Sequence, residues 1–223
     1  MYFSFIMKEE LEKINGIGLA AEKALNFIEK LIAAPLIEGT GILTGKVEYW
    51  RFKNKVGIIL KAKEFLKLKG IETPKKIPVK DLSTLLEYSS YEDDNFMKDS
   101  WANLLSNSLN PENKFDSNNI FIQILNQISS DEIVLLSSIN KLSSLDKLDR
   151  HLLKEEIKEK LEAFNEEIKL VLIDNLLRLG VLKELYDVNF SNSIVPGPLD
   201  NVFLGEFYSL TNLGKTFLGK ITS

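Results

Sequence analysis

The chain has 223 residues, of which 44% are hydrophobic and 27% charged, and its formal net charge is −4. That length is enough for one large domain or two small ones, each with its own core. The absence of cysteine excludes disulfides, thiolate nucleophiles and zinc–thiolate sites. No apolar run approaches the roughly 18 residues of a membrane span, and residues 1–7 lack the basic start of a signal peptide. We therefore expect a cytoplasmic protein.

The charge is unevenly distributed along the sequence. Residues 46–80 hold eleven Lys and Arg against three Glu, a net +8, so the remainder carries −12. Such a block can bind an anionic partner, including nucleic acid, or can pair with the acidic part of the same protein. The candidate contacts to a partner or a nucleic acid are Arg51, Lys53, Lys61, Lys63, Lys67, Lys75 and Lys76.

Helical periodicity dominates the first half of the chain. Apolar residues recur at helical spacing over 8–34, which predicts an amphipathic helix. After a glycine-containing loop, a long helix is expected over 46–69, ended by Gly70. Its lysines are distributed around the axis, which is typical of a helix that packs between neighbours.

Shorter helices follow. Two are predicted over 79–90 and from Asp93 and Asp94 to about Pro111, since acids favour the first turn of a helix. Two more are expected over 118–128 and 130–141. Ser129 and Glu132 have the spacing of a capping box at the start of the second of these helices.

The last third of the sequence mixes helical and extended patterns. Helices are predicted over 149–163 and 165–179, a strand over 181–185 and an extended stretch over 202–210, and Thr211 is expected to cap a final helix. This order predicts a mainly α protein, with an N-terminal helical bundle (residues 1–112) and a winged-helix-like α+β unit containing a small β-hairpin (residues 113–223). This order of elements indicates the fold and does not indicate the function.

No catalytic or cofactor template fits the sequence. The stretch GTGILTGK at 39–46 lacks the P-loop spacing and the hydroxyl after its lysine. Glu167 and Lys169 spell the E-x-K of restriction-type nucleases, but the surrounding pattern is helical. His151 is the single histidine, so a histidine pair or triad cannot form. The acids at 92–99 fit helix initiation better than a metal site, and we expect no cofactor and no enzymatic activity.

Nucleic-acid motifs are also weak. Residues 11–25 resemble one copy of a helix-hairpin-helix motif, whose glycine hairpin would offer amides to a phosphate. The helix predicted at 165–179, in the position of a recognition helix, is not basic. No Lys or Arg lies between Lys183 and Lys215 to hold phosphates. We therefore expect the C-terminal unit to serve packing or protein contact.

Three segments in order give residues 47–111 a resemblance to a known family. They are Tyr49-Trp50-Arg51-Phe52-Lys53-Asn54, the Pro-Lys-Lys-x-Pro of 74–78, and Trp101-Ala102-Asn103-Leu104-Leu105. Together they resemble the abortive infection alpha family of bacteria, and the similarity extends less distinctly from about residue 20 to the C-terminus. The resemblance implies an accessory role in defence against phage and brings no catalytic residues. Trp50 and Trp101 are expected to be core anchors.

Three functional hypotheses remain. The first is a non-enzymatic interaction protein of phage defence that acts through protein contacts or self-association. The second is nucleic-acid binding through residues 46–80, which would make affinity fall steeply with salt. The third is a membrane-perturbing toxin that uses the N-terminal amphipathic helix, although its mixed polar face suits anionic lipid less than a basic face would.

Overall fold

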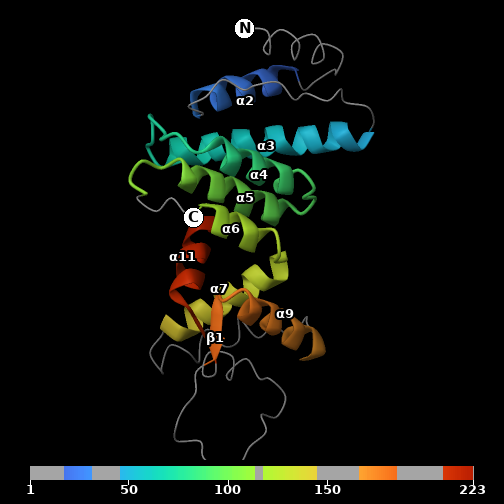
Figure 1. Ribbon diagram of the computed structural model, residues 1–223, viewed down its shortest axis with the longest axis vertical. Coiled ribbons are helices and arrows are strands. Elements are labelled where there is room, and N and C mark those ends of the chain that lie inside the picture. Colours follow the sequence, from blue (N-terminus) through green and yellow to red (C-terminus); the bar gives the residue numbers. More distant parts are fainter. Residues whose placement is uncertain (1–17, 32–45, 114–117, 145–165, 185–207, 223) are drawn as a thin grey trace, which may run out of the picture. The chain divides into compact units, whose positions relative to one another are not determined.

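The computed structural model describes residues 18–31, 46–113, 118–144, 166–184 and 208–222. These residues are mainly helical, with one small two-stranded antiparallel sheet (Figure 1). The chain folds as two compact units: unit 1 is Met1–Asn126 with Lys220–Ser223, and unit 2 is Gln127–Gly219. The sequence placed a boundary at residue 112, whereas the structure divides the chain after Asn126.

Unit 1 is a bundle built around one long basic helix. Its helices are α2 (Gly18–Leu31), α3 (Lys46–Leu68), α4 (Val79–Ser89), α5 (Asn95–Ser108) and α6 (Asn118–Leu125). Helix α3 packs against α2 on one side and against α4 and α5 on the other (Figure 1). Helix α6 contacts α4 and α5, which explains why it belongs to unit 1.

Helix α5 forms the centre of this bundle because nearly all of its length is buried. Trp101, Leu104 and Leu105 are at most 2% exposed, and each such burial stabilises the fold by roughly 1.5–3 kcal/mol. Its buried serines are satisfied within the helix, as where the hydroxyl of Ser108 donates to Leu104 O at 2.8 Å. The expected core role of Trp101 is confirmed; Trp50 is only half-buried, so its predicted core role was wrong.

The ends of the unit 1 helices follow the local sequence signals. Gly70 adopts a φ of 70°, the left-handed conformation that stops α3 where the sequence predicted. The Asp94 carboxylate accepts from Met97 N at 2.9 Å and caps α5, as its acidic start predicted. Both signals are local, so they could be recognised without knowledge of the tertiary structure.

Unit 2 contains α7 (Ser130–Ser144), α9 (Glu166–Arg178), β1 (Leu182–Glu184), β2 (Tyr208–Leu210) and most of α11 (Asn212–Ile221). The strands pair antiparallel, with Leu182 opposite Leu210. The predicted capping box is confirmed, since Ser129 N donates to the Glu132 carboxylate and Glu132 N donates to Ser129 Oγ. Thr211 Oγ1 accepts from Gly214 N at 3.0 Å, which confirms the predicted cap of α11.

Several predicted elements lie outside the described residues. They are the start of the N-terminal helix, the glycine loop at 39–45 with its P-loop-like stretch, the helix over 149–163 with His151, and most of the extended stretch over 202–210. Within the described ranges, the helices predicted over 46–69, 79–90, 118–128, 130–141 and 165–179 are confirmed to within a few residues.

Two helical glycines give a matched test of this packing. A Cβ at Gly57, in α3, would meet nothing within 4 Å, whereas a Cβ at Gly214, in α11, would clash with the carbonyl oxygen of Val181. Gly57→Ala should therefore raise the free energy of unfolding by up to about 1 kcal/mol, since alanine favours the helix. Gly214→Ala should lower it by about 1–3 kcal/mol. Denaturant unfolding of both variants measures this; a stability loss in Gly57→Ala would contradict the exposed position of residue 57.

Candidate functional site

Three basic side chains of α3 turn toward acids of unit 1. The Glu87 carboxylate, on α4, pairs with both the Arg51 guanidinium and Lys55 Nζ, the latter at 3.2 Å. Lys61 Nζ pairs with Asp99 on α5. Part of the basicity of α3 is therefore neutralised within the same unit, although such exposed pairs are each worth only about 0–1 kcal/mol.

Burial and the two cations shift the pKa of Glu87 in opposite directions. Burial alone would raise the pKa of the Glu87 carboxyl, but the hydrogen bond and charge of Lys55 and the charge of Arg51 lower it overall. Because the pKa of Glu87 is lower in the folded than in the unfolded state, this group stabilises the fold at pH values above its unfolded-state pKa. That contribution is lost as the pH falls through the lowered, folded-state pKa.

Asn54 forms the buried centre of the same contact. Its side-chain Nδ2 donates to Ser90 O at 3.1 Å and to Glu92 O at 2.7 Å, in the link between α4 and α5. Arg51 Nε adds a bond to Ser90 Oγ at 3.1 Å, and its guanidinium lies 4.2 Å from the centroid of the Tyr91 ring. Residues 51 and 54 therefore fix the rotation of α3 against α4 and α5.

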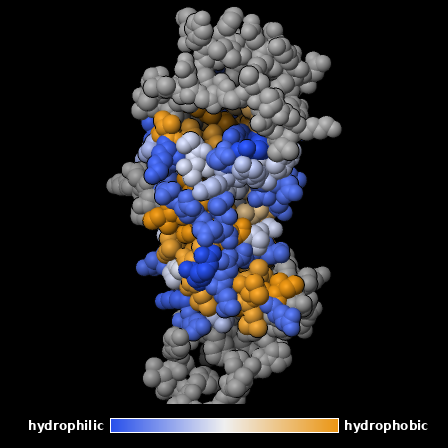
Figure 2. All heavy atoms as spheres, turned by 45° about the vertical axis from the view of Figure 1, so that its right-hand side comes forward, coloured by the Kyte–Doolittle hydropathy of each residue, from blue (hydrophilic) through white to orange (hydrophobic). Residues whose placement is uncertain are grey.

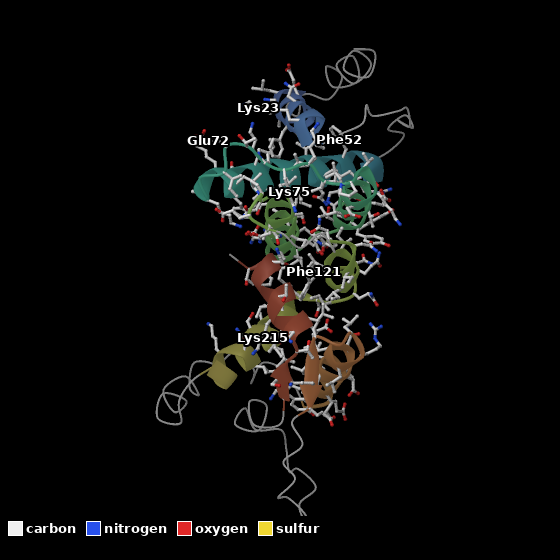
Figure 3. The ribbon with its side chains drawn as sticks, turned by 60° about the vertical axis from the view of Figure 1, so that its left-hand side comes forward. Lys23, Phe52, Glu72, Lys75, Phe121 and Lys215 are labelled. Carbon is white, nitrogen blue, oxygen red and sulfur yellow. The ribbon has the colours of Figure 1, made fainter. Side chains whose placement is uncertain are left out.

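The remaining predicted contacts are on other sides of unit 1. Lys63 Nζ lies 5.7 Å from the centroid of the Phe27 ring on α2, and Phe52 also lies on the α2 side of α3 (Figure 3). Lys53 and Lys67 are exposed, and the side chain of neither forms a hydrogen bond or ion pair with another described residue. Lys76 is likewise exposed, in the extended segment before α4. The seven predicted cations are thus not gathered into one basic surface.

A separate basic corner forms where α3, α5 and α11 end. Lys69 Nζ donates to Asn107 Oδ1 at 3.0 Å, and Lys75 Nζ donates to Asn113 O at 2.7 Å. Burial lowers the pKa of Lys69; burial and then the charges of Lys75 and Lys69 lower that of Lys220. Cations near helix C-termini complement the helix dipole, so this corner has a structural explanation.

An open hollow of about 690 Å³ adjoins that corner, and Figure 3 shows Glu72 at this end of α3. The hollow contains two carboxylates, from Glu72 and Glu112, against the single ammonium of Lys69, which does not favour an anion. Its lining residues are Lys69, Gly70, Ile71, Glu72, Thr73, Asn110, Pro111 and Glu112.

Helix α9 of unit 2 is held by polar contacts at its C-terminal half. Asn175 Nδ2 donates to Gln127 O at 3.0 Å, and Arg178 donates to the Gln127 side chain at 3.2 Å. Asn175 also bonds Glu132, which is 5% exposed. These side chains are therefore engaged within unit 2. Figure 2 shows apolar atoms exposed over α9, where Ile168, Leu170 and Val171 are the exposed apolar residues.

Neither a metal-binding cluster nor a membrane-spanning helix occurs in the described part of the chain. No group of three His, Asp or Glu side chains there is placed to hold a metal ion. No described helix is long and apolar enough to cross a membrane. Glu167 and Lys169 lie on a helix, not on the core strand that the nuclease motif requires.

The three family-like sequence segments meet in unit 1. Arg51 and Asn54 hold the link between α4 and α5, and Lys75 N, in the Pro-Lys-Lys-x-Pro segment, donates to Leu109 O at 2.8 Å. Trp101 fills the core, and Asn103 Nδ2 donates to Ile221 O at 3.2 Å. The unusual residues of these segments are thus structural contacts of one bundle.

Comparison with known proteins agrees with this pattern. The sequence profile of the family described as abortive infection alpha matches residues 52–219, about three quarters of the chain. The chain belongs to the abortive infection alpha family. No curated protein and no solved structure gives a significant match. Membership is therefore established by the family profile and brings no site residues with it.

Sequence reasoning missed three residues that the structure makes prominent on α3. Asn54 was noted only as part of the family segment, although a polar residue between apolar positions of a helix can signal a buried hydrogen bond. Gly57 and Glu64 were not singled out. Gly57 and Glu64 follow Lys53 by four and eleven residues, a spacing that places Lys53, Gly57 and Glu64 on one side of the helix. This spacing was visible in the sequence.

Replacing Asn54 tests the contact with the α4–α5 link. Asn54→Asp keeps the side-chain shape but removes both donors and brings a carboxylate against two carbonyl oxygens. We expect a loss of about 3–5 kcal/mol in the free energy of unfolding, since a buried charge is left without a partner. Asn95→Asp, at the exposed first turn of α5, is the control and should be neutral or slightly stabilising. Equal effects in the two variants, measured by urea unfolding, would contradict the Asn54 contact.

Proposed function

We propose that this member of the abortive infection alpha family acts in phage defence as a non-enzymatic interaction protein. We also propose that it contacts its partner through the outer face of α3, which is the side that carries Lys53 and Lys67. The observation that carries the proposal is the division of α3 into two sides. Arg51, Lys55 and Lys61 pair with acids of unit 1. The side chains of Lys53 and Lys67 are exposed and make no polar contact with another described residue.

The non-enzymatic part of the proposal rests on the sequence. The nucleotide, nuclease and histidine-based templates each fail on spacing, on secondary structure or on a missing residue. The titratable groups of unit 1 with clear partners, such as Glu87 and Asp99, are ion-paired across helices, an arrangement that favours packing over turnover.

We also propose that unit 2 is a winged-helix-like module used for protein contact. The order α9, β1, β2, α11 and the antiparallel pairing of the strands support this arrangement. In such a module α9 would hold the position of the recognition helix. Its polar residues Asn175 and Arg178 bond within the unit. Its exposed residues include three apolar ones and the acids Glu167 and Asp174, which favours a protein over a nucleic acid.

The two alternative functions have less support. For nucleic-acid binding, Arg51 and Lys61 would have to leave their ion pairs, and Glu64 lies between the exposed lysines Lys63 and Lys67 on α3. For membrane attack, the apolar residues of α2 would have to be free, but Phe27 and Ile28 are each 8% exposed in the packed unit.

A phage plaque assay with cells that express the protein tests the proposed function. The wild-type protein should reduce plaque formation, and Lys53→Glu/Lys67→Glu should abolish that protection while the protein stays folded, because the two positive charges of the outer face are reversed. Lys80→Glu/Lys215→Glu, an equal charge change at exposed residues of α4 and α11, should leave protection intact. His151→Ala should also protect, since a non-enzymatic function does not require proton transfer by the single histidine.

Two results would contradict the proposal. Full protection by Lys53→Glu/Lys67→Glu would remove the outer face of α3 from function. Loss of protection in a folded His151→Ala, or in another single variant of a polar side chain far from this face, would point to catalysis.

A further inference from the structure

One side of α3 carries a regular row of residues whose side chains form no hydrogen bond or ion pair with the described residues of unit 1. Trp50, Lys53, Gly57, Leu60, Glu64 and Lys67 succeed one another at intervals of three and four residues. This spacing places them along one side of the helix, and we call this row the outer seam. Four of its members are exposed, and Trp50 and Leu60 are half-buried.

The buried residues of α3 confirm that the outer seam faces away from the bundle. Asn54, Ile58 and Ala62 also succeed one another at four-residue intervals, and all three are at most 7% exposed. That buried row packs toward α4 and α5, where Asn54 bonds the link between them. Because the rotation of α3 is fixed by this contact, the outer seam stays at the surface of unit 1.

Gly57 is the residue of the outer seam for which unit 1 offers no explanation. A glycine inside a helix costs about 0.5–1 kcal/mol relative to alanine. Among the described residues nothing lies within 4 Å of a Cβ built at this position, so none of them requires a missing side chain here. A glycine on an exposed helical face instead permits close approach of a second helix from outside.

The outer seam is complementary to itself when two copies run antiparallel. About a two-fold axis through the midpoint between Ile58 and Ile59, Lys53 of one copy lies opposite Glu64 of the other, and the small Gly57 lies opposite the large Leu60. The same axis brings Trp50 opposite Lys67, a pair suited to a cation–π contact. Every contact occurs twice, as a two-fold interface requires.

Other arrangements of the same seam fit less well. Two parallel copies in register would place Lys53 against Lys53 and Glu64 against Glu64, which repel. A nucleic-acid backbone would meet the carboxylate of Glu64 and the apolar side chain of Leu60 among the lysines. Charge and size therefore both favour an antiparallel second copy.

We infer that the outer seam of α3 is a self-association surface, on which a second copy of this chain docks antiparallel with Lys53 facing Glu64 and Gly57 facing Leu60. The inference rests on the proposed function, since it names the partner of the face proposed there. A helix of 23 residues is about 35 Å long. Since one polar helical seam buries less than a standard interface, we expect a weak dimer, with a dissociation constant on the order of 10–100 µM.

Sedimentation velocity of the full chain, from about 5 to about 500 µM, tests the dimer over a range that brackets this affinity. The wild type should dimerise with concentration. Lys53→Glu and Glu64→Lys should each weaken the dimer by about tenfold or more, because two attractive pairs become repulsive. An equimolar mixture of the two variants should restore association, since position 53 of either variant then faces the opposite charge at position 64 of the other.

Two further variants separate the seam from general effects of charge and folding. Lys80→Glu changes the charge equally away from the outer seam and should dimerise as the wild type does. Gly57→Gln should remain folded, because position 57 is exposed and a Cβ there meets nothing within 4 Å, yet should weaken the dimer by about tenfold by separating the helices. A wild type that stays monomeric throughout, or a mixture that does not reassociate, would overturn the inference.

Combined with plaque assays, the same variants distinguish this inference from the proposed function. If both single variants lose protection and co-expression does not restore it, the outer face contacts a different protein, so the proposed function stands and self-association fails. If both variants dimerise poorly but protect fully, the dimer is real and the function assigned to this face is wrong. Restored dimerisation together with restored protection supports both.

Discussion

A buried carboxamide on α3, that of Asn54, holds two backbone carbonyls of the link between α4 and α5 at 2.7 and 3.1 Å. The cost of leaving those carbonyls and that amide unsatisfied makes this contact strongly directional. It sets the rotation of the long helix, and Arg51 reinforces it through Ser90 and Glu87. Once the rotation is fixed, the other features of α3 follow: which lysines meet acids, which residues fill the core, and which row remains exposed.

That rotation also changes the meaning of the basic segment. When only the sequence is considered, a net +8 over 35 residues allows either contact with an anionic partner or pairing with the acidic part of the same protein. In the folded unit, cations on one side of α3 pair with Glu87 and Asp99, and Lys69 and Lys75 lie among polar groups at helix ends. The segment is basic partly because it faces acidic helices, and its exposed row contains a glutamate and a glycine as well as lysines.

The sequence predicted the helical fold well where the signals are local. Gly70, Asp94 and the pair Ser129 and Glu132 mark helix ends through backbone conformation and capping, so the element boundaries could be predicted to within a few residues. Partnerships across the bundle were not predictable, because the acid that each lysine meets depends on the crossing of helices some 35 residues apart. For the same reason Trp50 was wrongly expected in the core: its apolar character was visible, but the rotation of α3 was not.

The central claim, that the cations of α3 serve the fold and a protein-contact face, is tested most directly by fluorescence anisotropy with random duplex and single-stranded DNA and RNA at low and at physiological salt. We expect no saturable binding at physiological salt, and at most weak binding at low salt that is unaffected by charge reversal at Lys61, because that lysine is already paired with Asp99. Tight binding whose affinity falls steeply with salt, and which is lost when Lys61, Lys63 and Lys67 are reversed, would contradict it and establish the basic segment as a nucleic-acid site.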